Sequence, residues 1–192
     1  MLKSSPLKLR EWDERYRSGE QVFDTPVPLV VNVAQGIKPG AALDLACGAG
    51  RNAIYLAERG WRVTAVDGAP SAIKIVQDRA AERGVDVDVR IANLQRGDFV
   101  MEPAAYDLIC ACYYLQRDLF PAMKAGVRPG GVVISIVHLA DPGEPRGAPK
   151  RAYPGELRTF FEGWRILHDY EGEPRESCHK RAVAEIAAER PG

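Results

Sequence analysis

The stretch "LDLACGAGRNAIYLAERGWRVTAVD", residues 43–67, carries the strongest structural signal in this 192-residue chain. It joins an apolar run, a loop containing Gly48 and Gly50, a helical segment and a second apolar run that ends at Asp67. Glycine lets a backbone approach a ligand closely because it has no side chain. A loop of this kind between a strand and a helix N-terminus is a common anion-binding arrangement. The stretch predicts an α/β fold whose ligand lies beyond the carboxyl ends of parallel strands.

The same alternation of apolar and helical segments continues on both sides of this stretch. A strand or a helix can be told from its hydrophobic period and from the glycines and prolines at its ends. The segment 178–190 is expected to be a strand, although its alanines also permit a helix. Strands are expected at 41–47, 61–67, 87–94, 106–115, 130–140, 164–174 and 178–190, and helices at 7–17, 27–37, 51–60, 70–84, 117–127 and 155–163. Such alternation predicts a parallel sheet with helices on both faces.

Composition excludes several classes of function. The chain has 26 basic and 26 acidic residues and a formal net charge of zero, so it lacks the basic footprint of most nucleic-acid-binding proteins. No apolar run is long enough to span a membrane, and the first residues do not resemble a signal peptide. Four cysteines show neither C-x-x-C nor zinc-like spacing, which predicts reduced thiols and no metal site. We expect a soluble, cytoplasmic protein, either a monomer or a homodimer.

The glycine loop alone does not identify its ligand. Gly48, Gly50 and Ala53 satisfy the dinucleotide template G-x-G-x-x-A, and Asp67 lies where a ribose-binding acid is expected. Asp44 is the discriminating residue, because a carboxylate inside an apolar strand is costly without a cationic partner. The methionine part of S-adenosylmethionine supplies an ammonium group for this carboxylate and a carboxylate for the helix N-terminus. Asp44 therefore favours S-adenosylmethionine over NAD.

Several motifs, in order along the chain, resemble those of the class I S-adenosylmethionine-dependent methyltransferases. They are "ALDLACGAGRNA" (42–53), "VTAVDGAP" (63–70), "IANLQRGDF" (91–99), "YDLICACYYL" (106–115) and "VRPGGVVIS" (127–135). "WDERY" (12–16) and "GELRTFFEGWRILHDYEGEP" (155–174) are most similar to the tellurite-resistance branch of that family. The resemblance implies a Rossmann-like doubly wound α/β sheet of seven strands, mostly parallel with an antiparallel final strand. It implies one domain over 1–192, with an N-terminal helical lid region (1–40), a cofactor-binding core (41–139), a loop (140–156) and a C-terminal helix with closing strands (157–192).

The resemblance also assigns roles to individual positions. Asp44 and Gly48 would line the methionine part of the cofactor, and Asp67 would bind its ribose. Asn93, where the family commonly has aspartate, can still accept a hydrogen bond from the adenine amino group. Tyr16 and Arg17 resemble residues that fold over the cofactor as a lid. The full set of expected cofactor contacts is Tyr16, Asp44, Ala46, Gly48, Gly50, Arg51, Asn52, Asp67, Gly68, Asn93, Leu94 and Cys112.

The acceptor is predicted to be a small molecule. Methyltransferases that act on nitrogens of bases or glutamine use a [DN]-P-P-[YF] motif, and this chain has Cys112-Tyr113-Tyr114-Leu115 at that site. The branch suggests a chalcogen oxyanion or a thiol. Candidate catalytic residues are Tyr113, His138, His179 and Arg181.

Alternatives stay open at this point. Each candidate catalytic side chain can equally be structural or solvated, and His168 is expected to be structural. A non-catalytic S-adenosylmethionine-binding protein is one other function. An NAD(P)-dependent oxidoreductase is less favoured because Tyr-x-x-x-Lys is absent.

Overall fold

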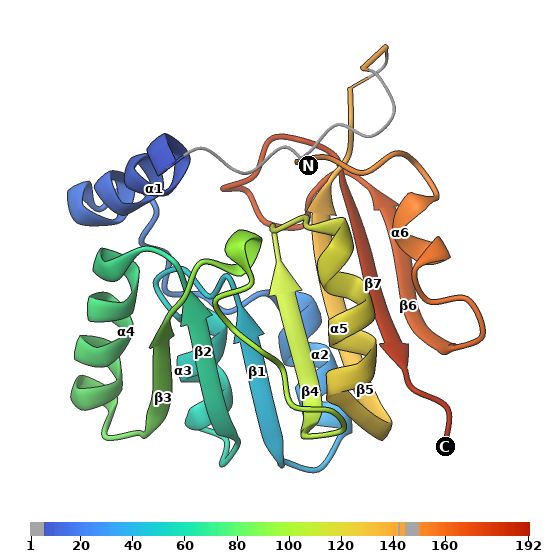
Figure 1. Cartoon of the computed structure of the whole chain (residues 1–192), viewed down its shortest axis with the longest axis horizontal. Helices are drawn as coiled ribbons and strands as arrows, with labels where there is room; N and C mark the ends of the chain where they lie inside the picture. Colours follow the sequence, from blue (N-terminus) through green and yellow to red (C-terminus); the bar gives the residue numbers. More distant parts are fainter. Residues whose placement is uncertain (1–5, 142, 145–149) are drawn as a thin grey trace.

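The structure, a computed structural model, describes residues 6–141, 143–144 and 150–192. One seven-stranded sheet has the order β3-β2-β1-β4-β5-β7-β6 (Figure 1). Every strand pair is parallel except the two that involve β7, which confirms the expected sheet. The strands are β1 (Ala41–Leu45), β2 (Arg62–Asp67), β3 (Val87–Ile91), β4 (Tyr106–Cys112), β5 (Val127–His138), β6 (Arg165–Gly172) and β7 (Val183–Glu189). The segment whose alanines also permitted a helix is therefore a strand.

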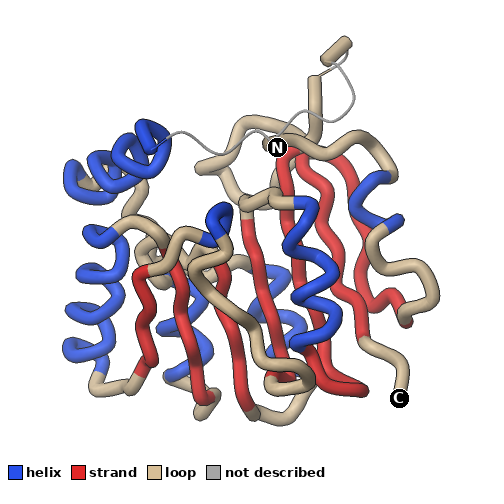
Figure 2. The backbone as a smooth tube through the Cα atoms, in the orientation of Figure 1, coloured by secondary structure: helices blue, strands red, loops and turns tan. Residues whose placement is uncertain are grey.

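Helices cover both faces of the sheet, as Figure 2 shows. The helices are α1 (Pro6–Ser18), α2 (Pro28–Gly36), α3 (Arg51–Ala57), α4 (Pro70–Arg83), α5 (Phe120–Gly126) and α6 (Glu156–Thr159). The side chains of α2, α3 and α4 pack against one face, and those of α5 and α6 against the other. Local sequence sets several ends: Pro70 begins α4, and Gly84 ends it in the left-handed conformation, with φ of 63°. Helix α1 lies above the carboxyl ends of the first strands (Figure 1).

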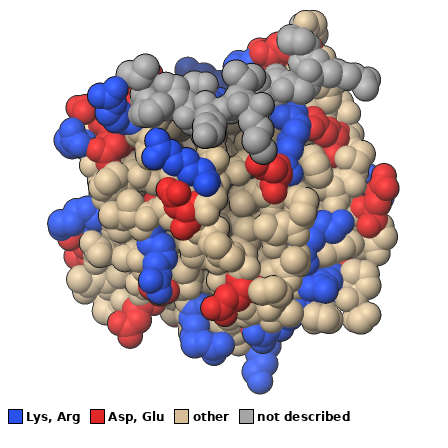
Figure 3. Space-filling model, viewed as in Figure 1, with Lys and Arg blue, Asp and Glu red and all other residues tan. Residues whose placement is uncertain are grey.

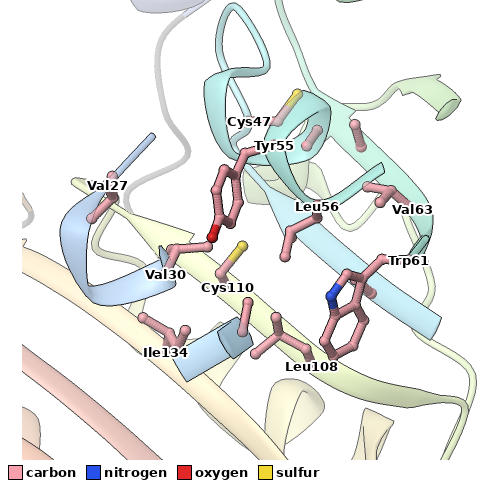
Figure 4. Packing of buried hydrophobic residues seen from close by; sticks show 14 of the residues in the cluster. Val27, Val30, Cys47, Tyr55, Leu56, Trp61, Val63, Leu108, Cys110 and Ile134 are labelled. Carbon is pink, nitrogen blue, oxygen red and sulfur yellow. The ribbon is translucent and has the colours of Figure 1, made fainter. Parts of the chain in front are cut away.

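The core is divided into two layers by the sheet. Strands buried on both faces alternate their side chains between the layers, so their sequences read as continuous apolar runs. Figure 4 shows the layer under α2 and α3, where the ring of Tyr55 points toward Val30 and Cys110. Leu56 and Leu108 fill the space beside it, and both are fully buried. This packing holds α3, and with it the glycine loop, against β1 and β4.

Several strands are shorter than expected, with β3 ending at Ile91, β4 ending at Cys112 and β7 beginning at Val183, and three other elements differ in further ways. Strand β5 begins at Val127 rather than after Pro129, and the shift in register between Tyr106 and Leu108 of β4 accommodates the early start. The expected helix 117–127 divides into a 3₁₀ turn, η2 (Arg117–Leu119), and α5. Pro121 causes the division, because proline is favoured in the first turn of a helix and disfavoured further inside it. The expected helix 155–163 is a single turn, α6. Part of the expected loop 140–156 lies outside the described residues, and the described part pairs Leu139 with Ala152.

The surface carries charges of both signs. On the face in Figure 3, lysine and arginine side chains intermingle with aspartate and glutamate. In the described ranges of the chain, no helix combines the length and the apolar character needed to cross a membrane.

Candidate functional site

The glycine loop after β1 alternates between left-handed and ordinary backbone. Ala46, Gly48 and Gly50 have φ values of 51°, 54° and 78°, whereas Cys47 and Ala49 between them are not in the left-handed region. The N–H groups of Cys47, Gly48 and Gly50 donate to the Val66 carbonyl, the Asp67 carboxylate and the Cys47 carbonyl, so hydrogen bonds within the fold fix this alternation. Ala46 adopts this conformation despite its Cβ, which marks the loop as a constrained segment. The loop is therefore held in one shape between β1 and the start of α3.

Asp44 is a buried carboxylate next to this loop. It lies in β1 and is 1% exposed, and its Oδ1 accepts a hydrogen bond from the thiol of Cys110, at 3.3 Å from Sγ. Its Oδ2 has no hydrogen-bond partner among the described residues. Burial raises the pKa of this carboxyl to about 7, a shift that the Cys110 hydrogen bond, the positive charge of Arg51 and the backbone N–H of Ala53 oppose. An ammonium group would satisfy the free oxygen and favour the ionised form.

Asp67 joins two loops at the carboxyl end of β2. Its Oδ2 accepts from the N–H of Gly48 at 2.9 Å, and its Oδ1 accepts from the N–H of Ala69 at 2.8 Å. Each oxygen keeps a second lone pair, so the carboxylate can accept further hydrogen bonds from a vicinal diol. Burial raises the pKa of Asp67, although these backbone N–H groups act in the opposite direction. The residue thus fixes the glycine loop while it presents acceptors to a ligand.

Helix α1 covers this edge of the sheet. A Cβ built on Gly48 would lie 2.6 Å from the hydroxyl of Tyr16, and one built on Gly68 would lie 2.8 Å from Cδ1 of Leu9. The helix is anchored by Asp13, whose Oδ1 accepts from the N–H of Ser71 in the first turn of α4 at 2.8 Å. Burial acts to raise the pKa of Asp13, but hydrogen bonds from Ser71 and the charge of Arg17 hold it below its usual value. Arg17 contacts Asp13 rather than the glycine loop.

The expected adenine-side residues follow β3. Asn93 precedes a 3₁₀ turn, η1 (Leu94–Arg96), and its Oδ1 accepts from the N–H of Gln95 at 3.1 Å. Leu94 is buried, and its carbonyl accepts from the Gln116 side chain at 3.2 Å. The side-chain oxygen of Asn93 is thus already engaged in capping the turn, with one lone pair left for a ligand.

Asn52 has a contact that the sequence did not predict. Its Oδ1 accepts from the N–H of Val27 at 2.9 Å, and the residue is 4% exposed. This hydrogen bond ties the start of α2 to α3. The structure thus gives the Asn52 oxygen a contact within the fold, and its contact with the cofactor stays a prediction.

A second group of polar side chains lies at the carboxyl ends of β4 and β5. Glu176, in the connection between β6 and β7 (residues 173–182), forms an ion pair with Arg51 and accepts a hydrogen bond from the hydroxyl of Tyr113. Tyr113 follows Cys112 directly and has a left-handed φ of 61°. This conformation aims its ring at His179, on which it stacks with 3.6 Å between ring centroids. Burial raises the pKa of the Cys112 thiol, which keeps this strand end uncharged.

His138 completes the group at the end of β5. Its ring centroid lies 5.4 Å from those of both Tyr113 and His179. Arg181 forms an ion pair with Asp141 beside it. Four residues that the sequence singled out separately, Tyr113, His138, His179 and Arg181, therefore come together; we call them and Glu176 the acceptor-edge cluster.

Glu176 was missed by sequence reasoning. It lies in the polar segment "EPRESCHKRA", residues 173–182, whose pattern has no hydrophobic period that could predict where any one side chain points. Only the antiparallel return of β7 brings this segment to the carboxyl edge. His168, by contrast, is a structural residue as expected: its Nε2 lies 3.0 Å from Oε2 of the buried Glu185. In the part of the chain that the structure describes, no group of three or more His, Cys, Asp or Glu side chains could hold a metal ion.

Comparisons with known proteins agree with this geometry. The model of the family "Tellurite resistance protein TehB" matches residues 15–182. A probable S-adenosyl-L-methionine-dependent methyltransferase TehB of Haemophilus influenzae is 26% identical over 150 residues, which are 72% of this chain and 50% of that protein. A ubiquinone biosynthesis O-methyltransferase of Methylocella silvestris is 31% identical over 155 residues, 76% of this chain and 57% of that protein. The chain thus spans about half the length of the curated relatives it matches.

The fold has a solved counterpart. The crystal structure of TehB from Haemophilus influenzae superposes with a TM-score of 0.74 at 23% identity, covering 93% of this chain and 67% of that one. The seven-stranded sheet with one antiparallel strand is that of the class I methyltransferases. Since the family match takes in most of the sequence, the chain belongs to the TehB family of tellurite resistance proteins.

Proposed function

We propose that the chain is an S-adenosylmethionine-dependent methyltransferase that methylates a small-molecule nucleophile by in-line displacement. The observation that carries the proposal is Asp44, a buried carboxylate with one oxygen lacking a hydrogen-bond partner among the described residues. A fully buried charge without a cation is unfavourable, and the ammonium group of the cofactor is a cation of suitable chemistry. NAD carries no ammonium group that could pair with this carboxylate.

The surrounding residues suit the other parts of the cofactor. Asp67 offers acceptors to two ribose hydroxyls, and it holds the glycine loop in place through the N–H of Gly48. Gly48 and Gly68 have no Cβ at points where Tyr16 and Leu9 of α1 approach closely. We propose that Asn93 and Leu94 border the adenine, and that α1 covers the bound cofactor. Arg51 and Cys112 then lie between the cofactor and the acceptor-edge cluster.

The chain's own contribution to the reaction is mainly positioning. When bound, S-adenosylmethionine supplies a methyl carbon on a positively charged sulfur, and the electron pair of the broken bond stays on that sulfur. Holding a nucleophile in line with this carbon converts a bimolecular encounter into an intramolecular step, which accounts for much of the barrier reduction in such reactions. Asp44, the glycine loop and Asp67 fix one partner, and the acceptor-edge cluster fixes the other.

The relatives support this activity. The matched proteins of Haemophilus influenzae and Methylocella silvestris are both named as methyltransferases. The TehB resemblance suggests a chalcogen oxyanion or a thiol as the acceptor. We propose Tyr113, His138, His179 and Arg181 as the side chains that meet it. A small acceptor rather than a nucleic acid, and a cytoplasmic location, are parts of the same proposal.

Calorimetric titration tests the cofactor first. We expect S-adenosylmethionine and S-adenosylhomocysteine to bind, and NADH not to bind; binding of NADH alone would refute the proposal. Transfer of a radiolabelled methyl group is then measured against thiols, selenite, tellurite and catechols. Cofactor binding without turnover on any of these acceptors would favour a non-catalytic binding protein.

A further inference from the structure

Two imidazoles in the acceptor-edge cluster each have a buried nitrogen with no hydrogen-bond partner in the described parts of the chain. These atoms are Nδ1 of His138 and Nε2 of His179. Buried polar atoms are nearly always paired in native proteins, because an unpaired one loses its hydration without compensation. The two nitrogens therefore indicate the place of a ligand's polar group.

The surroundings of both imidazoles favour the neutral form over the protonated one. Burial lowers the pKa of His179 to about 4, against the opposing charge of Glu176 and with further lowering by His138 and Arg51. Burial also lowers the pKa of His138, the positive charges of Arg181 and Arg151 add to this effect, and a hydrogen bond with the Arg181 backbone opposes it. A neutral imidazole can accept a proton, which a protonated one cannot.

The positive charges near the two imidazoles are already compensated. The three arginines whose charge acts on them are Arg51, Arg151 and Arg181. Each of these arginines forms an ion pair: Arg51 with Glu176, Arg151 with Glu144 and Arg181 with Asp141. An oxyanion bound here would meet arginines whose charge a carboxylate already balances, whereas an uncharged molecule needs no such counter-charge.

From these observations we infer that the acceptor is an uncharged compound that still carries its proton, a thiol or a hydroxyl, and that His138 removes this proton. The inference deepens the proposed function and rests on it. The proton of the S–H or O–H group passes to the free nitrogen of His138. The lone pair left on sulfur or oxygen forms the new bond to the methyl carbon as the bond from that carbon to the sulfonium sulfur breaks. His138 then releases the proton to water, and His179 holds the acceptor by a hydrogen bond.

His138 is better placed than His179 to be the base. It lies at the end of β5, which is paired along its length with β4 and β7, whereas His179 lies in the irregular connection 173–182. Groups on strands hold a catalytic geometry more tightly than groups on connections. A base also works best when its pKa is near the working pH, and His179, with a pKa of about 4, is a weaker base.

Histidine NMR provides a test that does not depend on turnover. The chain has three histidines, so the imidazole C–H and nitrogen resonances of each can be assigned. With S-adenosylhomocysteine bound, the protein is titrated with benzyl mercaptan, with catechol and, separately, with sodium selenite. We expect benzyl mercaptan or catechol, both uncharged near neutral pH, to shift the resonances of His138 and His179, whereas His168, paired with Glu185, stays unchanged and selenite has no effect at the same concentration. Shifts with selenite alone would overturn the inference.

Kinetics on the intact protein supplies the second test. His138→Gln is expected to lower kcat/KM for the methylated thiol or hydroxyl compound by about a hundredfold, the usual size of general-base catalysis. His179→Gln is expected mainly to raise KM, and His168→Gln serves as the matched control with unchanged kinetics. Affinity for S-adenosylhomocysteine, measured by calorimetry, should be the same in all three variants.

The outcomes separate this inference from the proposed function. If S-adenosylhomocysteine does not bind the wild-type protein, the proposed function itself is refuted. If the cofactor binds and only selenite or tellurite is methylated, or if His138→Gln keeps full activity, the proposed function stands and the inference is refuted.

Discussion

The thiol of Cys110 donates a hydrogen bond to the carboxylate of Asp44, with 3.3 Å between Sγ and Oδ1. Both side chains are buried, on neighbouring parallel strands whose register places the two residues side by side. This is the one side-chain donor that the described residues give to Asp44. The other charged or titratable groups that interact electrostatically with Asp44 are Arg51, Asp67, Cys47, Cys112 and Tyr16.

Cofactor affinity should therefore rise with pH. Asp44 has its pKa raised from 3.8 to about 7, so in the free protein it is largely protonated below that pH. Because the ammonium of the cofactor requires the carboxylate, the affinity should fall about tenfold per pH unit below pH 7 and level off above it. The same shift makes the free protein less stable as the pH rises from about 4 to about 7, since the native state then holds a proton that the unfolded chain has released. Calorimetry of S-adenosylhomocysteine at several pH values measures the first effect.

Three substitutions test the origin of this pH profile. Cys110→Ala removes the donor and should move the midpoint of the profile to higher pH, whereas Cys110→Ser retains a donor and should move it less. Asp44→Asn should bind weakly at every pH. A midpoint that is the same in Cys110→Ala as in the wild type would show that the thiol does not tune Asp44.

Gly48→Ala is predicted to harm both stability and cofactor binding. Its φ of 54° is strained for a residue with a Cβ, and the added methyl would lie 2.6 Å from the hydroxyl of Tyr16. The backbone strain alone costs about 1 kcal/mol. Gly60→Ala is the matched control, because Gly60 also has a positive φ but has nothing within 4 Å of its Cβ position. Chemical denaturation should show a lower free energy of unfolding for both variants, and calorimetry should show weaker cofactor binding for Gly48→Ala alone.

Asp67→Ala should weaken cofactor binding by about tenfold or more, an effect of the size expected for a lost charge-assisted hydrogen bond. The substitution removes the acceptors for a ribose diol, and it also frees the Gly48 N–H that Asp67 now holds. Asp86→Ala, which changes an exposed aspartate between α4 and β3, is the control. Equal affinities in the two variants, measured by calorimetry, would overturn the ribose assignment.

Asp13→Ala is expected to loosen α1 over the site. Asp13 supplies the side-chain hydrogen bond to Ser71 that ties α1 to α4. Hydrogen exchange should become faster at the Ser71 amide and throughout α1, with only a few-fold loss of cofactor affinity, since a surface contact of this kind contributes little to binding. Glu14→Ala is the control, because Glu14 is exposed and contacts only Arg17 of the same helix among the described residues. Unchanged exchange in Asp13→Ala would show that other contacts dock the helix.

Sequence reasoning succeeded where local pattern and fold coincide. The strand, loop and helix around Gly48 were predictable because a run of strand-like apolar residues ends there and a helical pattern begins. The burial of Asp44 within its strand was predictable too, whereas the cationic ligand expected for it stays a prediction. The length of β5 was not predictable, since Pro129 and Gly130 normally end a strand, and only the altered register against β4 admits them. The contact of Asn52 with Val27 and the ion pair of Arg51 with Glu176 both join distant segments, so no local pattern could reveal them.

The antiparallel course of β7 has an evolutionary consequence. Strands β6 and β7 are joined by a hairpin connection at the carboxyl edge, and this connection carries Glu176 and His179 to the site. The connection lies outside the strands, so the pairing of the sheet does not fix its sequence. Residues 173–182 can change in length or composition while β1 and β2, with Asp44 and Asp67, keep their register. Members of one family can in this way diversify in what they modify while the machinery for the common cosubstrate stays the same.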